Sequence, residues 1–255
     1  MLFHELSREQ LASIASDALV VVPIGATEQH GPHLPAGTDF LIVERIARRA
    51  ADVAEAEMPV VVTPTLPFGS SHHHLPFGAT MSLSTEVYYR VLMDLGASLV
   101  TDGFRRIFFL NGHGGNHELA QVVARDLALQ QPVNAAATSY WVVAWQALAE
   151  AGAGELGRYP GHASAFETSL ILASRPELVD TSRTPHRDEP GVAPLASEAA
   201  YRAEYNGYWQ SIDGFTGSPD LADPEFGRRF FDVIVQATAR AFVEFGRVTL
   251  RARQI

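Results

Sequence analysis

Four short stretches of the chain are almost continuously apolar, and each has the length of a β-strand. They are rich in β-branched, aromatic and small residues, and they span Ala18–Ile24, Pro59–Thr65, Arg106–Leu110 and Val133–Tyr140. A strand with one face in water alternates apolar and polar residues, whereas a strand covered on both faces does not. These runs therefore predict a mostly parallel sheet buried between other layers.

Segments with helical spacing of apolar residues lie between and after these runs. The clearest are Leu41–Val53, Thr85–Thr101, Asn116–Gln130 and Gly227–Phe245. Asp39 stands where a capping residue would open the first of them. This alternation predicts an α/β fold of three layers, a mostly parallel sheet flanked by helices. No linker or compositional break divides the chain, so we expect one domain over residues 1–255. The stretch Arg175–Asp220, rich in Pro, Asp, Ser and Gly, predicts a long surface excursion.

A polar cluster follows each predicted strand. GATEQHGPH comes after the first, LPFGSSHHH after the second, NGHGGNH after the third and SYW after the fourth. Loops at the carboxyl ends of parallel strands meet at one edge of the sheet, where α/β proteins place their sites. The clusters therefore predict an active site at that edge.

Two residue types are absent, and their absence narrows the possible chemistry. The chain has no cysteine and no lysine, so all 19 basic residues are arginine. Thiolate catalysis, Cys-ligated metals, Schiff-base chemistry and a phosphate-loop lysine are thereby excluded. Histidine, carboxylate, hydroxyl and amide groups remain for chemistry.

The overall charge and hydropathy argue against two kinds of partner. The net charge is -10, whereas nucleic-acid binding favours a basic surface. No apolar run reaches the roughly 20 residues of a membrane helix. The first eleven residues lack the basic-then-apolar pattern of a secretory signal. We therefore expect no nucleic-acid partner, no membrane partner and a cytoplasmic location.

Five side chains in the polar clusters form a mixed carboxylate and imidazole set, namely Glu28, His30, Asp39, His113 and Glu167. Such ligands suit zinc, manganese or iron. Five are too many for one catalytic zinc, but they fit two divalent metals about 3.5–4 Å apart with one carboxylate shared. Asp39 is the natural bridge because a carboxylate can bind through both oxygens.

Structural roles compete with this interpretation. Each of the five residues alone is more often a cap or a surface group, and only their convergence favours a metal site. His33 fits packing or an outer contact better than ligation. In the run His72–His74, consecutive side chains diverge, so at most two of the three can face the site.

Several motifs together resemble the creatininase family of metal-dependent amide hydrolases. They are PIGATEQHGPHLPAGTD, LPFGSSHHHLPFGATMSLS, NGHGGN, GHASAFETS and FTGSPDLADPEFGRR, and they run from the first strand to the last helix. The resemblance implies an α/β layered domain assembled as a homohexamer. It also implies one metal on Glu28, Asp39 and His113 and another on His30, Asp39 and a further carboxylate.

One position departs from the pattern expected of creatinine hydrolase. That enzyme is expected to carry a ligand Glu two residues after the loop histidine, where this chain has Gly115. Glu167 is the motif carboxylate left for the role. The departure counts against creatinine itself as the substrate, although not against metal-dependent hydrolysis.

The expected reaction is hydrolysis of a C–N amide bond by a water that bridges the metals. His162 is expected to be catalytic by giving a proton to the leaving nitrogen, with Glu167 beside it. The residues expected to contact the substrate are Ser71, His74, Gly114 and Trp141. From the substrates known in the family, the first candidate is a small cyclic amide or formamide. The second is a peptide bond that is cleaved in the maturation of a peptide-derived redox cofactor. A member that binds metal or ligand without catalysis is the remaining alternative.

Overall fold

The computed structural model describes residues 1–157, 159–187 and 204–252. Four parallel strands form one sheet in the order β2–β1–β3–β4. The strands are β1 (Leu19–Ile24), β2 (Val60–Val62), β3 (Arg106–Asn111) and β4 (Asn134–Ser139). The two central strands, β1 and β3, are buried along their whole length, which explains their continuous apolar sequence.

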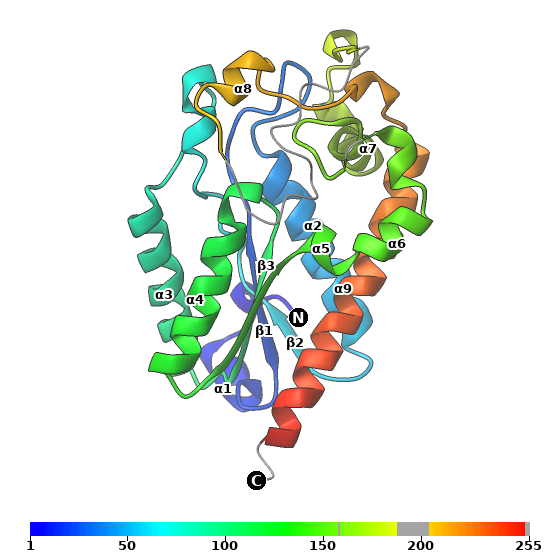
Figure 1. Ribbon diagram of the computed structural model, residues 1–255. Helices are drawn as coiled ribbons and strands as arrows, with labels where there is room; N and C mark the ends of the chain where they lie inside the picture. The colour runs from blue at the N-terminus through cyan, green and yellow to red at the C-terminus, as the bar shows by residue number, and fades with distance from the viewer. Residues whose placement is uncertain (158, 188–203, 253–255) are drawn as a thin grey trace.

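Alternate residues of β1 face two separate cores because side chains alternate across a strand. Leu19 and Val21 pack in a core with α2 (Thr38–Ala54) and α9 (Pro224–Ala252). Val20 and Val22 pack in a core with α3 (Thr85–Thr101) and α4 (His117–Gln130). Figure 1 shows the result, with α3 and α4 on one face of the sheet and α2 and α9 on the other. The three-layer α/β prediction is confirmed.

Shorter helices and turns complete the described chain. The α-helices are α1 (Arg8–Ile14), α5 (Tyr140–Val143), α6 (Trp145–Glu150), α7 (Ala165–Ser174) and α8 (Tyr208–Ser211). The 3-10 turns are η1 (Phe3–Glu5), η2 (His72–Phe77), η3 (Gly114–Asn116), η4 (Ala153–Leu156), η5 (Pro176–Leu178), η6 (Thr181–Arg183) and η7 (Pro219–Leu221). None of the helices described has the length and hydropathy needed to cross a bilayer.

Helix α7 is held close against α9 by a glycine. A Cβ on Gly227 of α9 would come within 1.9 Å of the Ser169 carbonyl oxygen of α7. Only a residue without a side chain permits this approach. The contact fixes the start of α7, which carries Glu167, relative to the rest of the fold.

The first long helix begins earlier than the sequence predicts. It starts at Thr38 rather than Leu41, so Asp39 lies inside the first turn instead of capping it. The cap position is Gly37, and no side chain caps the helix there. The capping prediction for Asp39 was therefore wrong, because its carboxylate contacts two histidines instead of the backbone.

The expected surface excursion is only partly on the surface. Residues 188–203, and Arg158 before it, lie outside the described residues. After the gap the chain turns inward, since Ile212 and Phe215 are buried and α8 lies above the carboxyl edge of the sheet (Figure 1). This segment forms part of the wall of the site.

Candidate active site

The predicted ligands come from four separate elements that end at the same edge of the sheet. Glu28 and His30 lie in the loop after β1, which the Glu28 N–H closes by donating to the Ala36 carbonyl at 2.9 Å. Asp39 is in the first turn of α2, His113 follows β3 and Glu167 opens α7. All five are buried. The convergence that the strand order predicts is present.

Asp39 lies between two groups of potential ligands. Its Oδ2 is 3.0 Å from His113 Nδ1, which is also 3.2 Å from Glu28 Oε1. Its Oδ1 is 3.1 Å from His30 Nε2, which in turn is 3.8 Å from Glu167 Oε2. Each group offers three donor atoms close enough to hold one metal ion. The two oxygens of Asp39 thus face different groups.

Unpaired oxygens at the centre fit a metal better than a purely structural polar cluster. Glu28 Oε1, Glu28 Oε2 and Asp39 Oδ2 are buried and accept no hydrogen bond from the described residues, and only the His113 ring, when charged, could pair with two of them at 3.0–3.2 Å. A buried carboxylate without a partner is costly unless a cation compensates it. The donor set is all oxygen and imidazole nitrogen, which suits zinc, manganese or iron.

Outer hydrogen bonds orient two of the histidines as metal ligands usually are oriented. His30 Nδ1 donates to the Glu28 carbonyl at 3.1 Å, so its Nε2 lone pair faces Asp39 and Glu167. His113 Nε2 donates to the Ser70 carbonyl at 3.1 Å and lies 3.2 Å from the Ser71 hydroxyl. His113 therefore turns its Nδ1 lone pair towards Asp39.

The close packing of these groups shifts their protonation. Burial disfavours a charged His30, but the Asp39 carboxylate outweighs burial and raises the pKa of His30 to about 10. Burial raises the pKa of Glu167 to about 8. Burial also opposes ionisation of Asp39, yet the His30 and His113 rings hold the pKa of Asp39 well below its usual range. Without metal, carboxylates and protonated rings therefore neutralise one another.

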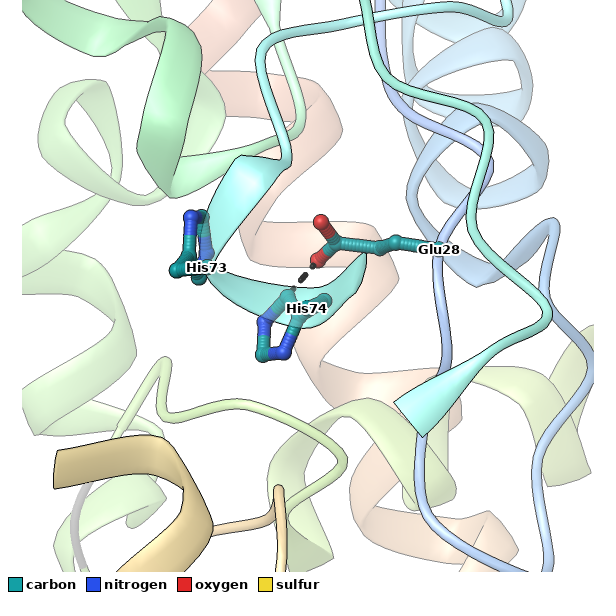
Figure 2. A group of neighbouring side chains, drawn as sticks. All are labelled: Glu28, His73 and His74. Atoms are coloured by element: carbon teal, nitrogen blue, oxygen red, sulfur yellow. Dashed lines mark ion pairs between the residues drawn. The ribbon is translucent and has the colours of Figure 1, made fainter. Parts of the chain in front are cut away.

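Two more histidines, His74 and His162, approach Glu28 from the other side. Glu28 Oε1 lies 3.4 Å from His162 Nδ1 and 3.6 Å from His74 Nε2. Figure 2 shows Glu28 reaching towards the His74 ring, with His73 on the same turn but not paired to Glu28. Burial lowers the pKa of His74 to about 3 and that of His162 well below its ordinary value. Both rings are neutral at pH 7.

A cavity of about 900 Å³ opens over the cluster. Three of the four residues expected to contact the substrate line it, namely His74, Gly114 and Trp141. The fourth, Ser71, lies behind His113 with its hydroxyl against the outer ring nitrogen. It is fully buried, and the neighbouring Ser70 lines the cavity in its place. Ser71 therefore contacts the His113 ring, and its contact with substrate stays a prediction.

Sequence reasoning missed two residues of the site. Trp209 of α8 packs edge-on against His74, with ring centroids 4.6 Å apart, and against His162 at 5.4 Å. Gln29 contacts both of these histidines through its side-chain amide. Gln29 could have been found from its place between two ligands in the motif, whereas nothing in the sequence near Trp209 connects it with the site.

Gly115 departs from the expected pattern because there is no space for a side chain. A Cβ there would lie 2.3 Å from the Ser70 carbonyl oxygen and 2.5 Å from His113 Nε2. Any ligand side chain at this position requires the backbone at Ser70 to move. Glu167 lies next to His30, with its Oε2 3.8 Å from His30 Nε2.

The family follows from comparison of the whole chain with known proteins. The family model described as creatininase, creatinine amidohydrolase, matches residues 4–242. The chain belongs to the creatininase family. The structure named "Creatininase Mn" superposes on this creatininase-family chain with a TM-score of 0.79 at 26% identity, over 95% of this chain and 97% of that chain.

Two kinds of relative are named for different activities. The mycofactocin precursor peptide peptidase of Mycolicibacterium smegmatis is 34% identical over 87% of this chain and 83% of its own length. The creatinine amidohydrolase of Pseudomonas putida is 30% identical over 90% of both chains. This creatininase-family chain is therefore similar to a peptidase and to a hydrolase of a small cyclic amide.

Proposed function

We propose that this creatininase-family chain hydrolyses a C–N amide bond with the help of two divalent metal ions. Asp39 would be a ligand of both ions. The observation that carries the proposal is the position of Asp39, whose two oxygens face different three-residue groups. Glu28 and His113 complete the first metal site, and His30 and Glu167 complete the second. Zinc and manganese, the metals named for solved creatininases, both suit these ligands.

The metals, when bound, supply a polarised carbonyl and a water of lowered pKa. The remaining steps belong to side chains of this protein. His162 turns Nδ1 towards the cluster, while its Nε2 lies 2.9 Å from the Gln29 carbonyl. Since a carbonyl only accepts, Nε2 carries the hydrogen and Nδ1 has a lone pair.

His162 therefore acts as a base before it acts as an acid. The oxygen of the attacking water bonds to the amide carbon, and a water proton passes to His162 Nδ1. That proton then passes to the nitrogen as the C–N bond breaks, and the ring returns to its starting form. The expected donation to the leaving nitrogen is retained, with proton uptake added before it.

The preferred substrate is an amide in a molecule larger than creatinine, and a peptide is the first candidate. A cavity of about 900 Å³ is near the top of the range of about 300–1,000 Å³ for small-molecule sites. Gly115 also removes the carboxylate that the creatinine pattern requires. These observations place a peptide ahead of a small cyclic amide or formamide, whereas the sequence analysis ranks the two substrate classes the other way round.

A small cyclic amide or formamide is the second candidate. The observation in its favour is that Trp209 packs against His74 and His162 in the lining of the cavity, which suits a compact planar group. The similarity to creatinine amidohydrolase supports it further. A homohexamer and a cytoplasmic location stay predictions.

The test compares amide classes with the metal-loaded and metal-free protein. Protein loaded with Mn²⁺ or Zn²⁺ is incubated with short peptides, creatinine and formamides, and the amines released are quantified. We expect release from peptides, abolished by dialysis against a chelator and restored by added metal. Full activity in protein shown to be metal-free would exclude the mechanism. Turnover of creatinine or formamide alone would favour the second candidate, and turnover of none would favour a non-catalytic member.

A further inference from the structure

The Gln29 side-chain amide lies between His74 and His162, and two backbone groups fix its orientation. Its Oε1 accepts from the Gly31 N–H at 2.9 Å, and its Nε2 donates to the Gly214 carbonyl at 2.7 Å. Reversing the amide would put oxygen against a carbonyl and nitrogen against an N–H. Only one orientation satisfies both contacts.

This orientation determines which nitrogen of His74 carries hydrogen. The second hydrogen of Gln29 Nε2 is available to His74 Nδ1 at 2.8 Å, whereas His162 Nε2 at 3.1 Å is itself a donor. His74 Nδ1 therefore accepts, and the hydrogen of this neutral ring is on Nε2. That N–H is buried and has no hydrogen-bond partner among the described residues.

His74 Nε2 faces Glu28, whose Oε1 is 3.6 Å away, and Figure 2 shows this pair. Buried donors are rarely left without an acceptor, so this one is placed for an acceptor that the substrate brings. The same tautomer prevents ligation through Nε2, which has no lone pair to offer. The inference therefore predicts that the compact group of Glu28, His73 and His74 holds no metal ion.

We infer that Gln29 is a positioning residue that sets the Nε2–H tautomer on two histidines, and that His74 donates to the substrate oxygen. This inference rests on the proposed amide hydrolysis. The Nε2–H of His74 stabilises the oxygen that gains negative charge as water attacks, and His74 keeps its proton throughout. His162 has the same tautomer but turns its unprotonated Nδ1 towards the cluster, and it transfers the proton.

Two distant parts of the chain hold Gln29 in place. Its main-chain N–H donates to the Thr80 hydroxyl at 3.1 Å. Gly214 approaches from the segment after α8 with a φ of 70°, and a Cβ there would lie 2.9 Å from Gln29 Nε2. A side chain at position 214 would therefore displace the amide. These contacts indicate that the positions of the donor and the acceptor in the Gln29 amide matter as well as the volume of its side chain.

The first measurement is independent of activity. In Zn²⁺-loaded protein with ¹⁵N-labelled histidine, the ¹⁵N shifts and proton couplings of His74 and His162 report which nitrogen carries hydrogen. His74→Asn and His162→Asn assign the signals. We expect hydrogen on Nε2 of both rings, with His74 Nδ1 unprotonated and His162 Nδ1 unprotonated or metal-bound. Hydrogen on His74 Nδ1, or a His74 Nε2 bound to zinc, would overturn the inference.

The second measurement uses Gln29→Glu, which keeps the shape but replaces the donor by an acceptor. His74 should then carry hydrogen on Nδ1, and kcat should fall about 100-fold, as on loss of one oxyanion donor. KM and zinc content should change little. The matched control is Gln121→Glu, because Gln121 Nε2 contacts His117 Nε2 at 3.0 Å on an exposed helix face; it should keep the wild-type kcat.

The outcomes separate this inference from the proposed function. A Gln29→Glu protein that binds zinc, unfolds at the wild-type temperature and keeps the wild-type kcat would overturn the catalytic part. If wild-type protein hydrolyses no amide, the proposed function fails, while the tautomer measurement still supports or overturns the assignment to Gln29. If Gln29→Glu does not fold, the wild-type spectrum decides.

Discussion

His30 Nε2 lies 3.1 Å from Asp39 Oδ1, with both side chains buried. Nine residues separate them in sequence, and the loop that contains Gly31, Pro32 and Pro35 brings them together. The other oxygen of Asp39 faces His113 at 3.0 Å. A carboxylate in this position joins two groups of ligands, so most of the expected behaviour of the site depends on it.

Removing one oxygen of Asp39 should empty both metal sites. We expect Asp39→Asn to bind less than one metal ion per chain and to lose activity more than about 100-fold, since losing even an outer hydrogen-bond partner costs 10–100-fold. Metal analysis and amine release measure the two effects. Asp52→Asn, on the exposed face of the same helix, should change neither. Two ions retained by Asp39→Asn would contradict the shared role.

Gly114 and Gly115 should tolerate alanine very differently. A Cβ at Gly115 meets the Ser70 carbonyl and the His113 ring, whereas a Cβ at Gly114 meets nothing within 4 Å. Gly115→Ala should therefore displace His113 and weaken metal binding at least about 10-fold, as loss of an outer contact does. Gly114→Ala should keep metal content and unfolding temperature. Equal metal affinity in the two variants would show that the Ser70 backbone moves without disturbing His113, and would contradict the prediction.

Trp209 should contribute to substrate binding. Its ring covers His74 and His162 and lines the cavity. Losing the buried face of an aromatic ring against substrate costs about 1–2 kcal/mol, so Trp209→Ala should raise KM about 10-fold. Trp145→Ala is the control, because Trp145 is half-exposed and stacks on Tyr159. A rise in KM for Trp145→Ala alone would place the substrate elsewhere.

Metal affinity should increase as pH rises from 7 to 9. Without metal, Glu167 has a pKa of about 8 and His30 one of about 10, so both hold protons at pH 7. A metal must displace those protons, and the competition weakens as pH rises. Competition with a chromophoric chelator, corrected for the chelator's own titration, measures this. In Glu167→Gln the increase around pH 8 should disappear.

The same pKa shifts give the metal-free protein the opposite dependence. The pKa of Glu167 is raised from 4.5 and that of His30 from 6.5, so the folded state binds more protons than the unfolded state. Stability should fall as pH rises from 7 to 9, and the unfolding temperature of chelator-treated protein should fall with it. The unfolding temperature of Zn²⁺-loaded protein should fall less over the same pH range. A metal-free protein more stable at pH 9 would contradict both pKa directions.

The sequence predicted the sheet well because burial on both faces leaves a clear trace. β1 and β3 are continuous apolar runs, and periodic apolar positions predicted α2, α3, α4 and α9. The predicted helix boundaries were less accurate. Aspartate is a common capping residue, but the Asp39 carboxylate contacts histidine side chains instead of the helix backbone. For Ser71, the pattern indicated proximity to the site without showing which side of His113 it occupies.

The sequence by itself determined the α/β layering and named the five candidate ligands, because residues that follow parallel strands meet at one edge of the sheet and because Glu167, which opens α7, lies in a motif. Only the tertiary structure decided the orientation of each group. The two oxygens of Asp39 face different clusters, Gln29 fixes the hydrogens of His74 and His162, and Trp209 arrives from a segment with no motif. Orientation depends on hydrogen bonds and contacts between segments far apart in the chain, and no local pattern of residues specifies those contacts.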